Sequence, residues 1–154
     1  MEGVNTVHHV CWCVRPENMD QARAYWEEAI GLPPLEDLDL PDLGIRVLVS
    51  WDGGVEVMCP THVEGSMSAD IRRFLEERGE GVYSVVYKVA DIANTMARIS
   101  QRGGTLVFEE SIPADAVEDR NLAADPTQDR FSIKQALFED ICGMRVCLQE
   151  IIKE

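Results

Sequence analysis

The chain has 154 residues, which is enough for one compact globular unit or for two fused half-units. Its formal net charge of −14 argues against nucleic acids and anionic membrane surfaces as partners, because proteins bind both through clustered Lys and Arg. No apolar run reaches the roughly 18 residues of a membrane span, and the N-terminus does not resemble a secretory signal. The five cysteines are odd in number and lie in strand-like runs, which is typical of reduced thiols, so we expect a cytoplasmic protein.

The run from Val7 to Val14 reads as a β-strand in which alternate side chains point to opposite faces. One face carries side chains that are small or able to bind a ligand, namely His9, Cys11 and Cys13. The other face is bulky and apolar, with Val10, Trp12 and Val14. We therefore expect the first face to line a cavity and the second face to pack against a helix.

The rest of the first half predicts a β-α-β-β order. Asn18 is a candidate N-cap for a helix that Gly31 would end. The acidic segment 35–43 is a possible extra strand at the edge of the sheet. A tight turn at 52–54 predicts a hairpin. The predicted elements are a strand at 7–14, a helix at 19–30 and strands at 44–51 and 55–59.

The second half begins after a linker helix that Ser68 would cap and that runs through Arg78. Asp91 is a candidate N-cap for the next helix. Residues 109–130 show no clear period and predict a long loop of the kind that often closes over a site. The predicted elements are a strand at 82–89, a helix at 92–102, a strand at 105–108 and closing strands at 131–138 and 145–151.

The two halves share one order of elements, because the run 83–89 repeats the pattern of the first strand. Ser84 takes the place of His9, and Val89 takes the place of Val14. Such a duplication predicts an α+β fold of two tandem β-α-β-β-β modules whose curved sheets form a cleft. The predicted boundaries are 1–62 for the first module, 63–80 for the linker helix and 81–154 for the second module.

Equivalent positions of the two modules would face each other across that cleft. On the first strands these are His9 and Ser84, and on the last strands they are Glu56 and Cys147. Imidazole and oxygen ligands that converge on one point suit a divalent metal that polarises a carbonyl group. Cations in strand-like runs are candidates for binding an anionic substrate, namely Arg46, Lys88, Lys134 and Arg145.

Three passages resemble one known family. The run His9–Val14 is similar to its His-Ile-Gly-Ile-Ala-Val-like first strand, and Val55–Pro60 is similar to an Ile-Glu-Leu-Leu-x-Pro-like strand. Residues Phe74–Ser84 are similar to a Phe-Leu-x-x-Arg-Gly-Glu-Gly-Ile-His-His-like passage. The chain thus resembles the vicinal oxygen chelate superfamily, which includes glyoxalase I, extradiol dioxygenases, bleomycin-resistance proteins and methylmalonyl-CoA epimerase. Among these it most resembles the epimerase.

The resemblance implies a glyoxalase-like fold and an isomerase of the epimerase kind. Such an enzyme abstracts a proton next to the carbonyl group of a small acid or an acyl-CoA-type thioester, and it often forms a homodimer. Glu56 would be the catalytic base. His9 would be a second acid or base, or the group that holds the enolate oxygen.

The departures from the family pattern concern the metal. The family's second metal-binding histidine falls on Ser84, its neighbouring histidine on Tyr83 and its final glutamate on Cys147. Only His9 and Glu56 keep their types as metal ligands. We expect that no metal is bound. The alternative is an atypical site, in which one divalent ion would bind His9, Glu56 and the Cys147 thiolate.

Three alternatives stay open at this point. Glu56 could be neutralised by Arg46 or Arg145 instead of acting as a base. The protein could be a metal-free small-molecule binder of the drug-sequestering kind, or a structural domain that keeps only the fold. The candidate substrate-binding residues are Ser84, Cys147, Tyr83, Arg145 and Lys134.

Overall fold

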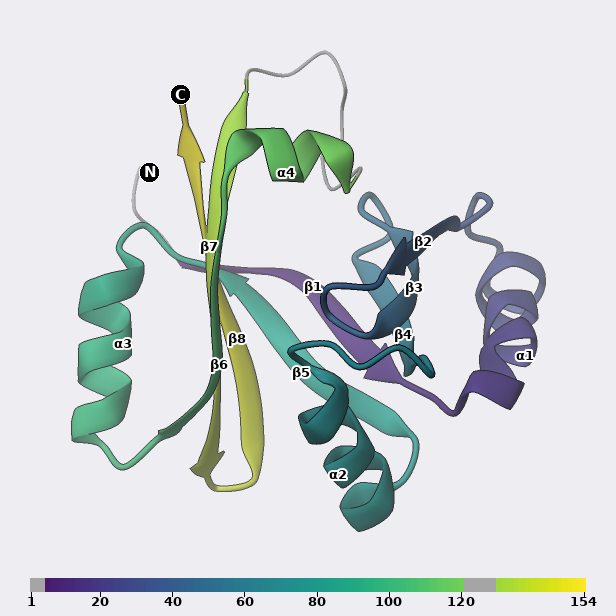
Figure 1. Cartoon of the computed structure of the whole chain (residues 1–154), viewed down its shortest axis with the longest axis horizontal. Helices are drawn as coiled ribbons and strands as arrows, with labels where there is room; N and C mark the ends of the chain where they lie inside the picture. Colours follow the sequence, from purple (N-terminus) through teal and green to yellow (C-terminus); the bar gives the residue numbers. More distant parts are fainter. Residues whose placement is uncertain (1–4, 121–129) are drawn as a thin grey trace. The chain divides into compact units, whose positions relative to one another are not determined.

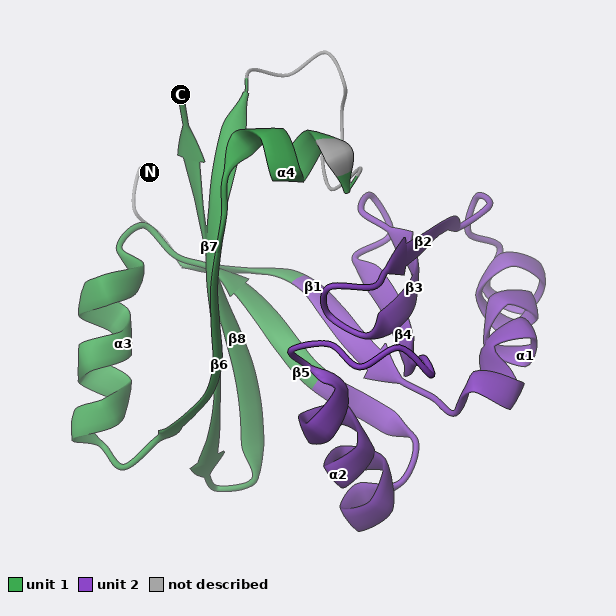
Figure 2. Cartoon of the chain, viewed as in Figure 1, with its two compact units in different colours: residues 1–8, 84–154 green, residues 9–83 purple. Residues whose placement is uncertain are grey.

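The computed structural model describes residues 5–120 and 130–154. It divides into two compact units, which Figure 2 colours separately. Unit 2 is residues 9–83, and unit 1 is residues 1–8 together with 84–154, as far as these are described. The predicted module boundaries at 62 and 81 stay predictions, because this division into compact units does not test them.

Unit 2 holds a mixed sheet with the strand order β2-β3-β4-β1 (Figure 1). Neighbouring strands are antiparallel except β4 and β1, which are parallel. The elements are β1 (Thr6–Cys13), α1 (Met19–Ala24), a π-helical continuation (Tyr25–Ile30), β2 (Glu36–Leu40), β3 (Ile45–Ser50), β4 (Val55–Pro60) and α2 (Ser68–Arg78).

Unit 1 holds a sheet with the order β5-β8-β7-β6, in which β5 and β8 are parallel and the other neighbours antiparallel. Its elements are β5 (Gly81–Lys88), α3 (Ile92–Gln101), β6 (Thr105–Ile112), α4 (Ala114–Asp119), β7 (Phe131–Ile141) and β8 (Met144–Lys153). The first three residues of β5 belong to unit 2. Each sheet therefore pairs its first strand in parallel with its last. The predicted α+β class and the repeated β-α-β-β-β order are confirmed.

The predicted loop at 109–130 is wrong in its first half. Strand β6 continues through Ile112 because it pairs with β7 as far as Ile133. The helix α4 then begins after Pro113, and its Val117 packs against Ile112 and Ile133. Residues 121–129, which were also part of the predicted loop, lie outside the described residues.

The apolar face of β1 packs against α1 as predicted. Trp12 and Val14 contact a core that includes Met19 and, from the π-helical continuation, Trp26. The indoles of Trp12 and Trp26 lie 5.9 Å apart, centroid to centroid. The helix ends at Gly31 in the left-handed conformation, as the sequence predicts.

Two of the three predicted helix caps behave differently from the prediction. The Asn18 side chain makes no capping bond and donates instead to the Glu80 carboxylate at 2.9 Å. Ser68 is the first residue of α2, and its hydroxyl accepts from the Gly65 amide. Asp91 caps α3 as predicted, because its carboxylate accepts from the Asn94 amide.

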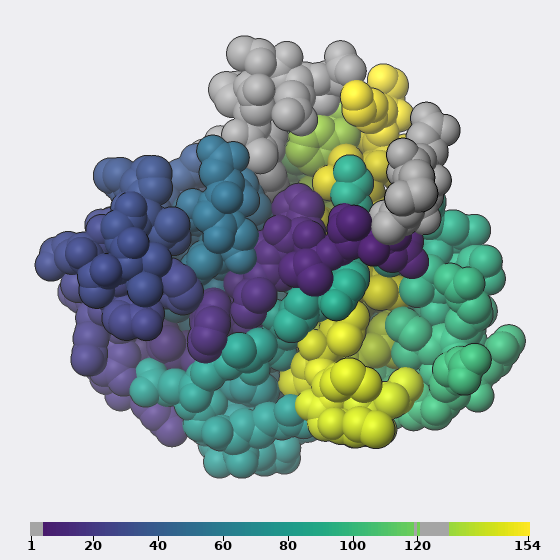
Figure 3. Space-filling model, turned by 180° about the vertical axis from the view of Figure 1, so that it is seen from behind, coloured from purple at the N-terminus to yellow at the C-terminus, as the bar shows by residue number. Residues whose placement is uncertain are grey.

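The two faces of the unit 1 sheet are covered by different helices, which lie on opposite sides of the strands in Figure 1. One face packs on α3 through Ala136, Phe138 and Leu148. The other face packs on α4 through Ile112 and Ile133. Seen from behind in Figure 3, α3 and the turn between β7 and β8 lie side by side at the surface.

A close approach of two backbones fixes the start of β3 against the segment before α2. The amides of Ser66 and Met67 donate to the carbonyls of Asp42 and Leu43 at 3.0 and 3.1 Å. A Cβ at Gly65 would overlap the backbone of Leu43 and of the next residue. Only glycine fits there, because backbone atoms cannot move aside as a flexible side chain can.

We expect Gly65→Ala to lower the free energy of unfolding by about 3 kcal/mol, since the added methyl group meets backbone on its contacting side. Urea unfolding followed by circular dichroism measures the loss. Gly31→Ala is the matched control, because Gly31 has a left-handed φ of 88° and no atom near its Cβ position. It should cost only about 1 kcal/mol. Equal losses in the two variants would contradict the steric explanation.

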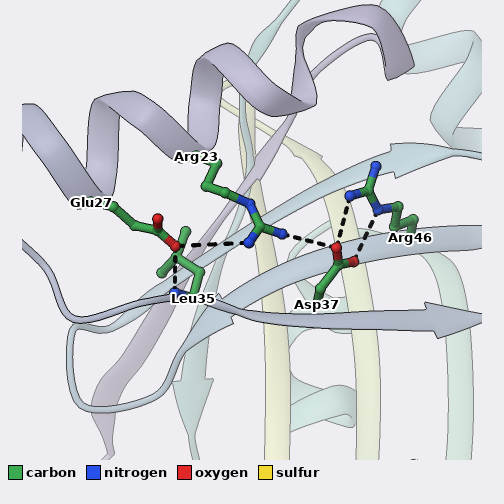
Figure 4. Close-up of polar contacts among 5 residues, drawn as sticks. All are labelled: Arg23, Glu27, Leu35, Asp37 and Arg46. Atoms are coloured by element: carbon green, nitrogen blue, oxygen red, sulfur yellow. Dashed lines mark hydrogen bonds and ion pairs between the residues drawn. The ribbon is translucent and has the colours of Figure 1, made fainter.

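A network of charges ties the first helix to the β2 edge of the sheet (Figure 4). Arg46 on β3 donates to both oxygens of Asp37 on β2, at 2.9 and 2.8 Å. Arg23 on α1 donates to the same carboxylate at 2.9 Å. The Glu27 carboxylate accepts from the Leu35 amide at 2.7 Å. The hydrogen bond from Arg46 and the charges of both arginines hold the pKa of Asp37 below its ordinary value.

We expect Asp37→Asn to lower the free energy of unfolding by about 0.5–1 kcal/mol at neutral pH, because the network is largely exposed. A carboxylate with a depressed folded-state pKa stabilises the protein above its unfolded-state pKa and loses that contribution as the pH falls through the folded value. The difference between the two proteins should therefore shrink as the pH falls through the folded-state pKa of Asp37 and vanish below it. Urea unfolding across this pH range measures it, and Asp52→Asn in the exposed β3–β4 turn is the control. A difference that does not depend on pH would show that the ionised Asp37 carboxylate is not the source of the stabilisation.

Candidate functional site

The candidate site in unit 2 is built by the parallel pairing of β1 with β4. The register sets Cys11 beside Glu56, so their side chains share one face of the sheet. His9 lies two residues before Cys11 and therefore shares that face. Its Nε2 lies 3.1 Å from Glu56 Oε2. An ionised carboxylate only accepts, so the imidazole N–H donates in this contact.

The imidazole is more deeply buried than the carboxylate. The side chain of His9 is 4% exposed and that of Glu56 is 19% exposed. The indole of Trp51 meets the His9 ring edge to face, with centroids 5.4 Å apart and planes at 81°. The carboxylate thus remains within reach of a small molecule, while the histidine behind it is held on two sides.

The arginines that could have neutralised Glu56 are engaged elsewhere. Arg46 binds Asp37, and Arg145 forms a buried ion pair with Glu139. Among the described residues, the hydrogen-bond partner of Glu56 is His9. The predicted structural alternative for Glu56, a pairing with one of these two arginines, is therefore wrong.

The donor set in unit 2 does not fit a firmly bound metal by itself. Catalytic metal sites usually have three protein ligands or more, and the pair offers one imidazole and one carboxylate that bind each other. Within residues 5–120 and 130–154, no group of three His, Cys, Asp or Glu side chains is placed to hold a metal ion.

The predicted equivalence of the two halves is visible in the strand registers. In unit 2, Glu56 pairs with the residue two positions after His9. In unit 1, Cys147 pairs with Val86, two positions after Ser84. Ser84 is buried, and Cys147 is half-buried. All five cysteines lie in the described part of the chain, and none of them forms a disulfide. The substrate-binding roles of Ser84 and Cys147 stay predictions.

The other predicted substrate-binding residues have different surroundings. Tyr83 is buried, its hydroxyl donates to Asp70, and its ring packs edge to face on Phe74 with centroids 5.1 Å apart. The Arg145 guanidinium is buried in its ion pair, and Lys134 on β7 is exposed. Their substrate-binding roles also stay predictions.

Two features of the sites in the structure were missed by sequence reasoning. The contact of Trp51 with the His9 ring was not predicted. Asp70 was not considered as the partner of Tyr83, because the two residues come from a helix and a later strand. Neither contact has a periodic signal in the sequence.

Comparison with known proteins identifies the family of the chain. Residues 5–123 match the family model described as Glyoxalase/Bleomycin resistance protein/Dioxygenase superfamily. The chain belongs to this superfamily. No curated protein is similar enough in sequence to count as a match.

Solved structures of low sequence identity share the fold. A hypothetical protein from Bacillus halodurans C-125 is 17% identical with a TM-score of 0.63, and the match covers 97% of this chain and 96% of that chain. Methylmalonyl-CoA epimerase from Mycobacterium tuberculosis is 20% identical with a TM-score of 0.60, covering 94% and 86%. A methylmalonyl-CoA epimerase in complex with methylmalonyl-CoA and NH4+ is 15% identical with a TM-score of 0.61, covering 96% and 94%. None of the described helices has the length and apolar character to cross a membrane.

The contact between His9 and Glu56 should be visible as an energetic coupling. We expect the unfolding free energies of His9→Ala, Glu56→Ala and the double variant to give a coupling of about 1–3 kcal/mol, because the hydrogen bond is partly buried and one partner is charged. Urea unfolding of the four proteins measures it. A cycle of His9→Ala with Glu76→Ala, on the exposed side of α2, is the control and should be additive. Additivity in the first cycle would contradict the contact.

Proposed function

We propose that this protein catalyses proton transfer at the carbon next to a carbonyl group, as an epimerase or isomerase acting on a small acid or an acyl thioester. The observation that supports the proposal most directly is the hydrogen bond between His9 Nε2 and Glu56 Oε2. It leaves the second carboxylate oxygen of a partly exposed glutamate available as a base.

Glu56 has the position that a general base requires. One oxygen is held by the imidazole, so the carboxylate has a fixed direction, and the other oxygen has no partner among the described residues. Its limited exposure removes competing water, and among the described residues no arginine occupies the carboxylate. A rigid base that is open on one side is better suited to abstraction than a solvated one.

In the proposed reaction, Glu56 takes the proton from the carbon next to the carbonyl group. The electron pair of the broken C–H bond forms a C=C bond, and the carbonyl pair moves to oxygen to give an enolate. Glu56 is then neutral and holds the imidazole N–H less strongly, so His9 can turn its N–H to the enolate oxygen. If a water molecule gives a proton to the opposite face of the carbon, the centre is inverted, and the hydroxide that remains takes the proton held by Glu56. If Glu56 first exchanges its proton with water and then returns one to the same face, the α-proton is exchanged without inversion.

The substrate class rests on the structural relatives. One epimerase of the same fold was solved with methylmalonyl-CoA bound, which is an acyl thioester with an acidic proton between two carbonyl groups. This supports an acyl-CoA-type substrate for the present chain, although 15% identity establishes only the shared fold. We extend the proposal to small keto acids, because Glu56 and His9 act on the carbonyl end of the molecule.

The test is exchange of the α-proton in D₂O, followed by proton NMR with methylmalonyl-CoA, propionyl-CoA and pyruvate. We expect the protein to accelerate exchange with at least one of them, and Glu56→Gln to lower that rate by about 100-fold or more. The exposed Glu76→Gln variant is the matched control and should exchange at the original rate. We expect exchange to persist in excess EDTA, because the pair works through its own atoms.

Three outcomes would contradict the proposal in different ways. If Glu56→Gln keeps the full rate, Glu56 is not the base. If EDTA abolishes exchange and a divalent metal restores it, the reaction depends on a metal. If none of the three compounds exchanges and an aromatic ligand binds tightly, the drug-sequestering alternative replaces the enzyme.

A further inference from the structure

A row of polar side chains crosses the unit 1 sheet on the face opposite α3. The registers align Lys88 on β5 with Gln149 on β8, Gln149 with Gln135 on β7, and Gln135 with Glu110 on β6. Paired residues of neighbouring strands point to the same face. The neighbouring position Leu148 packs on the α3 side, so this row points to the other side.

The row lies between two apolar rows of the same face. One consists of Val86, Cys147 and Leu137, and the other of Ile151, Ile133 and Ile112. Among these, Leu137, Ile133 and Ile112 are buried. Within the row, Gln149 is buried, Gln135 and Glu110 are half-buried and Lys88 is exposed. An apolar residue in place of Gln149 would have extended this core without a desolvation cost, so the buried amide needs a reason other than packing.

Two members of the row, Gln135 and Glu110, are already joined, and Arg120 binds the second of them. Glu110 accepts from Gln135 Nε2 at 2.9 Å with one oxygen and from Arg120 at 2.8 Å with the other. Arg120 follows α4 directly. Because the Glu110 carboxylate only accepts, it fixes the Gln135 amide with its nitrogen toward Glu110 and its oxygen turned away.

Gln149 is the member that no described residue satisfies. The residue is only 7% exposed, and its buried Oε1 has no hydrogen-bond partner among the described residues. A buried amide oxygen without a partner typically costs about 1–3 kcal/mol. A group that carries such a cost in a folded protein calls for a reason, and a bound partner is one.

We propose that this polar row is a binding site for a small molecule that carries a secondary amide. The amide N–H of the ligand donates to Gln149 Oε1, and its carbonyl accepts from the Lys88 ammonium. Lys88 and Arg120 each carry one positive charge, and Glu110 carries one negative charge. The row together with Arg120 therefore has one net positive charge, which disfavours a cationic ligand. The ligand is therefore neutral or anionic. The site concerns unit 1 alone and stands whether or not α-protons exchange.

The test is a titration with N-acetylglycine N-methylamide, which has two secondary amides, followed by ¹⁵N–¹H NMR of the side-chain amides. Methyl acetoxyacetate is the matched ester without an N–H group. We expect saturable shifts of the Gln149 and Gln135 side-chain signals with the amide only. Gln149→Met should weaken the binding by about tenfold or more, because one hydrogen bond to a buried acceptor is lost.

A second measurement separates a ligand site from a structural role. Gln149→Met should raise the urea midpoint of the free protein, since it removes the unsatisfied oxygen at similar volume. Gln101→Met at the end of α3 is the control and should change neither value. If Gln149→Met does not fold, Lys88→Met takes its place in the titration and should also weaken the binding, because the donor to the ligand carbonyl is lost. A lower midpoint for Gln149→Met would assign the oxygen to a structural water and overturn the proposal, as would shifts of equal size with the ester.

Discussion

The parallel pairing of β1 with β4 is the constraint on which the candidate site depends. It sets the face of β1 that carries His9 beside Glu56, and the side chains then meet at 3.1 Å. The same pairing turns Trp12 toward the first helix, where it anchors the core. One register therefore decides both which residues fold the unit and which are left to act on a ligand.

Each unit has one parallel pair of strands, and the residues on the equivalent faces of the two pairs differ. In unit 1 the parallel pair is β5 and β8, and the equivalents of His9 and Glu56 are Ser84 and Cys147. The imidazole and carboxylate chemistry is thus kept in one copy only. The other copy has instead a transverse row of amides and charges around Gln149. Duplication followed by divergence of the inward positions allows each copy to take a separate role.

Most of the fold could be predicted from the sequence, because strand alternation and helix periodicity are local signals. The pairing of His9 with Glu56 followed from the repeat and the family resemblance together. The helix at Ala114–Asp119 could not be predicted, since six residues show too little period and its Val117 is stabilised by contacts with β6 and β7. The partner of Asn18 was missed for a related reason, because Glu80 is 62 residues away. Long-range polar contacts leave no pattern in the sequence around either member.

The alternation of side chains along β4 has a consequence for how this site can change. Glu56 reaches the imidazole only because Val55 and Val57 on either side of it face the helix core. Loss or gain of a single residue in the short turn at 51–54 would shift the phase of the strand, bury the carboxylate among methyl groups and expose valines in its place. An insertion or deletion in that turn is therefore more damaging than a substitution in it. The chemistry of the site can change only through substitutions that keep the strand in phase.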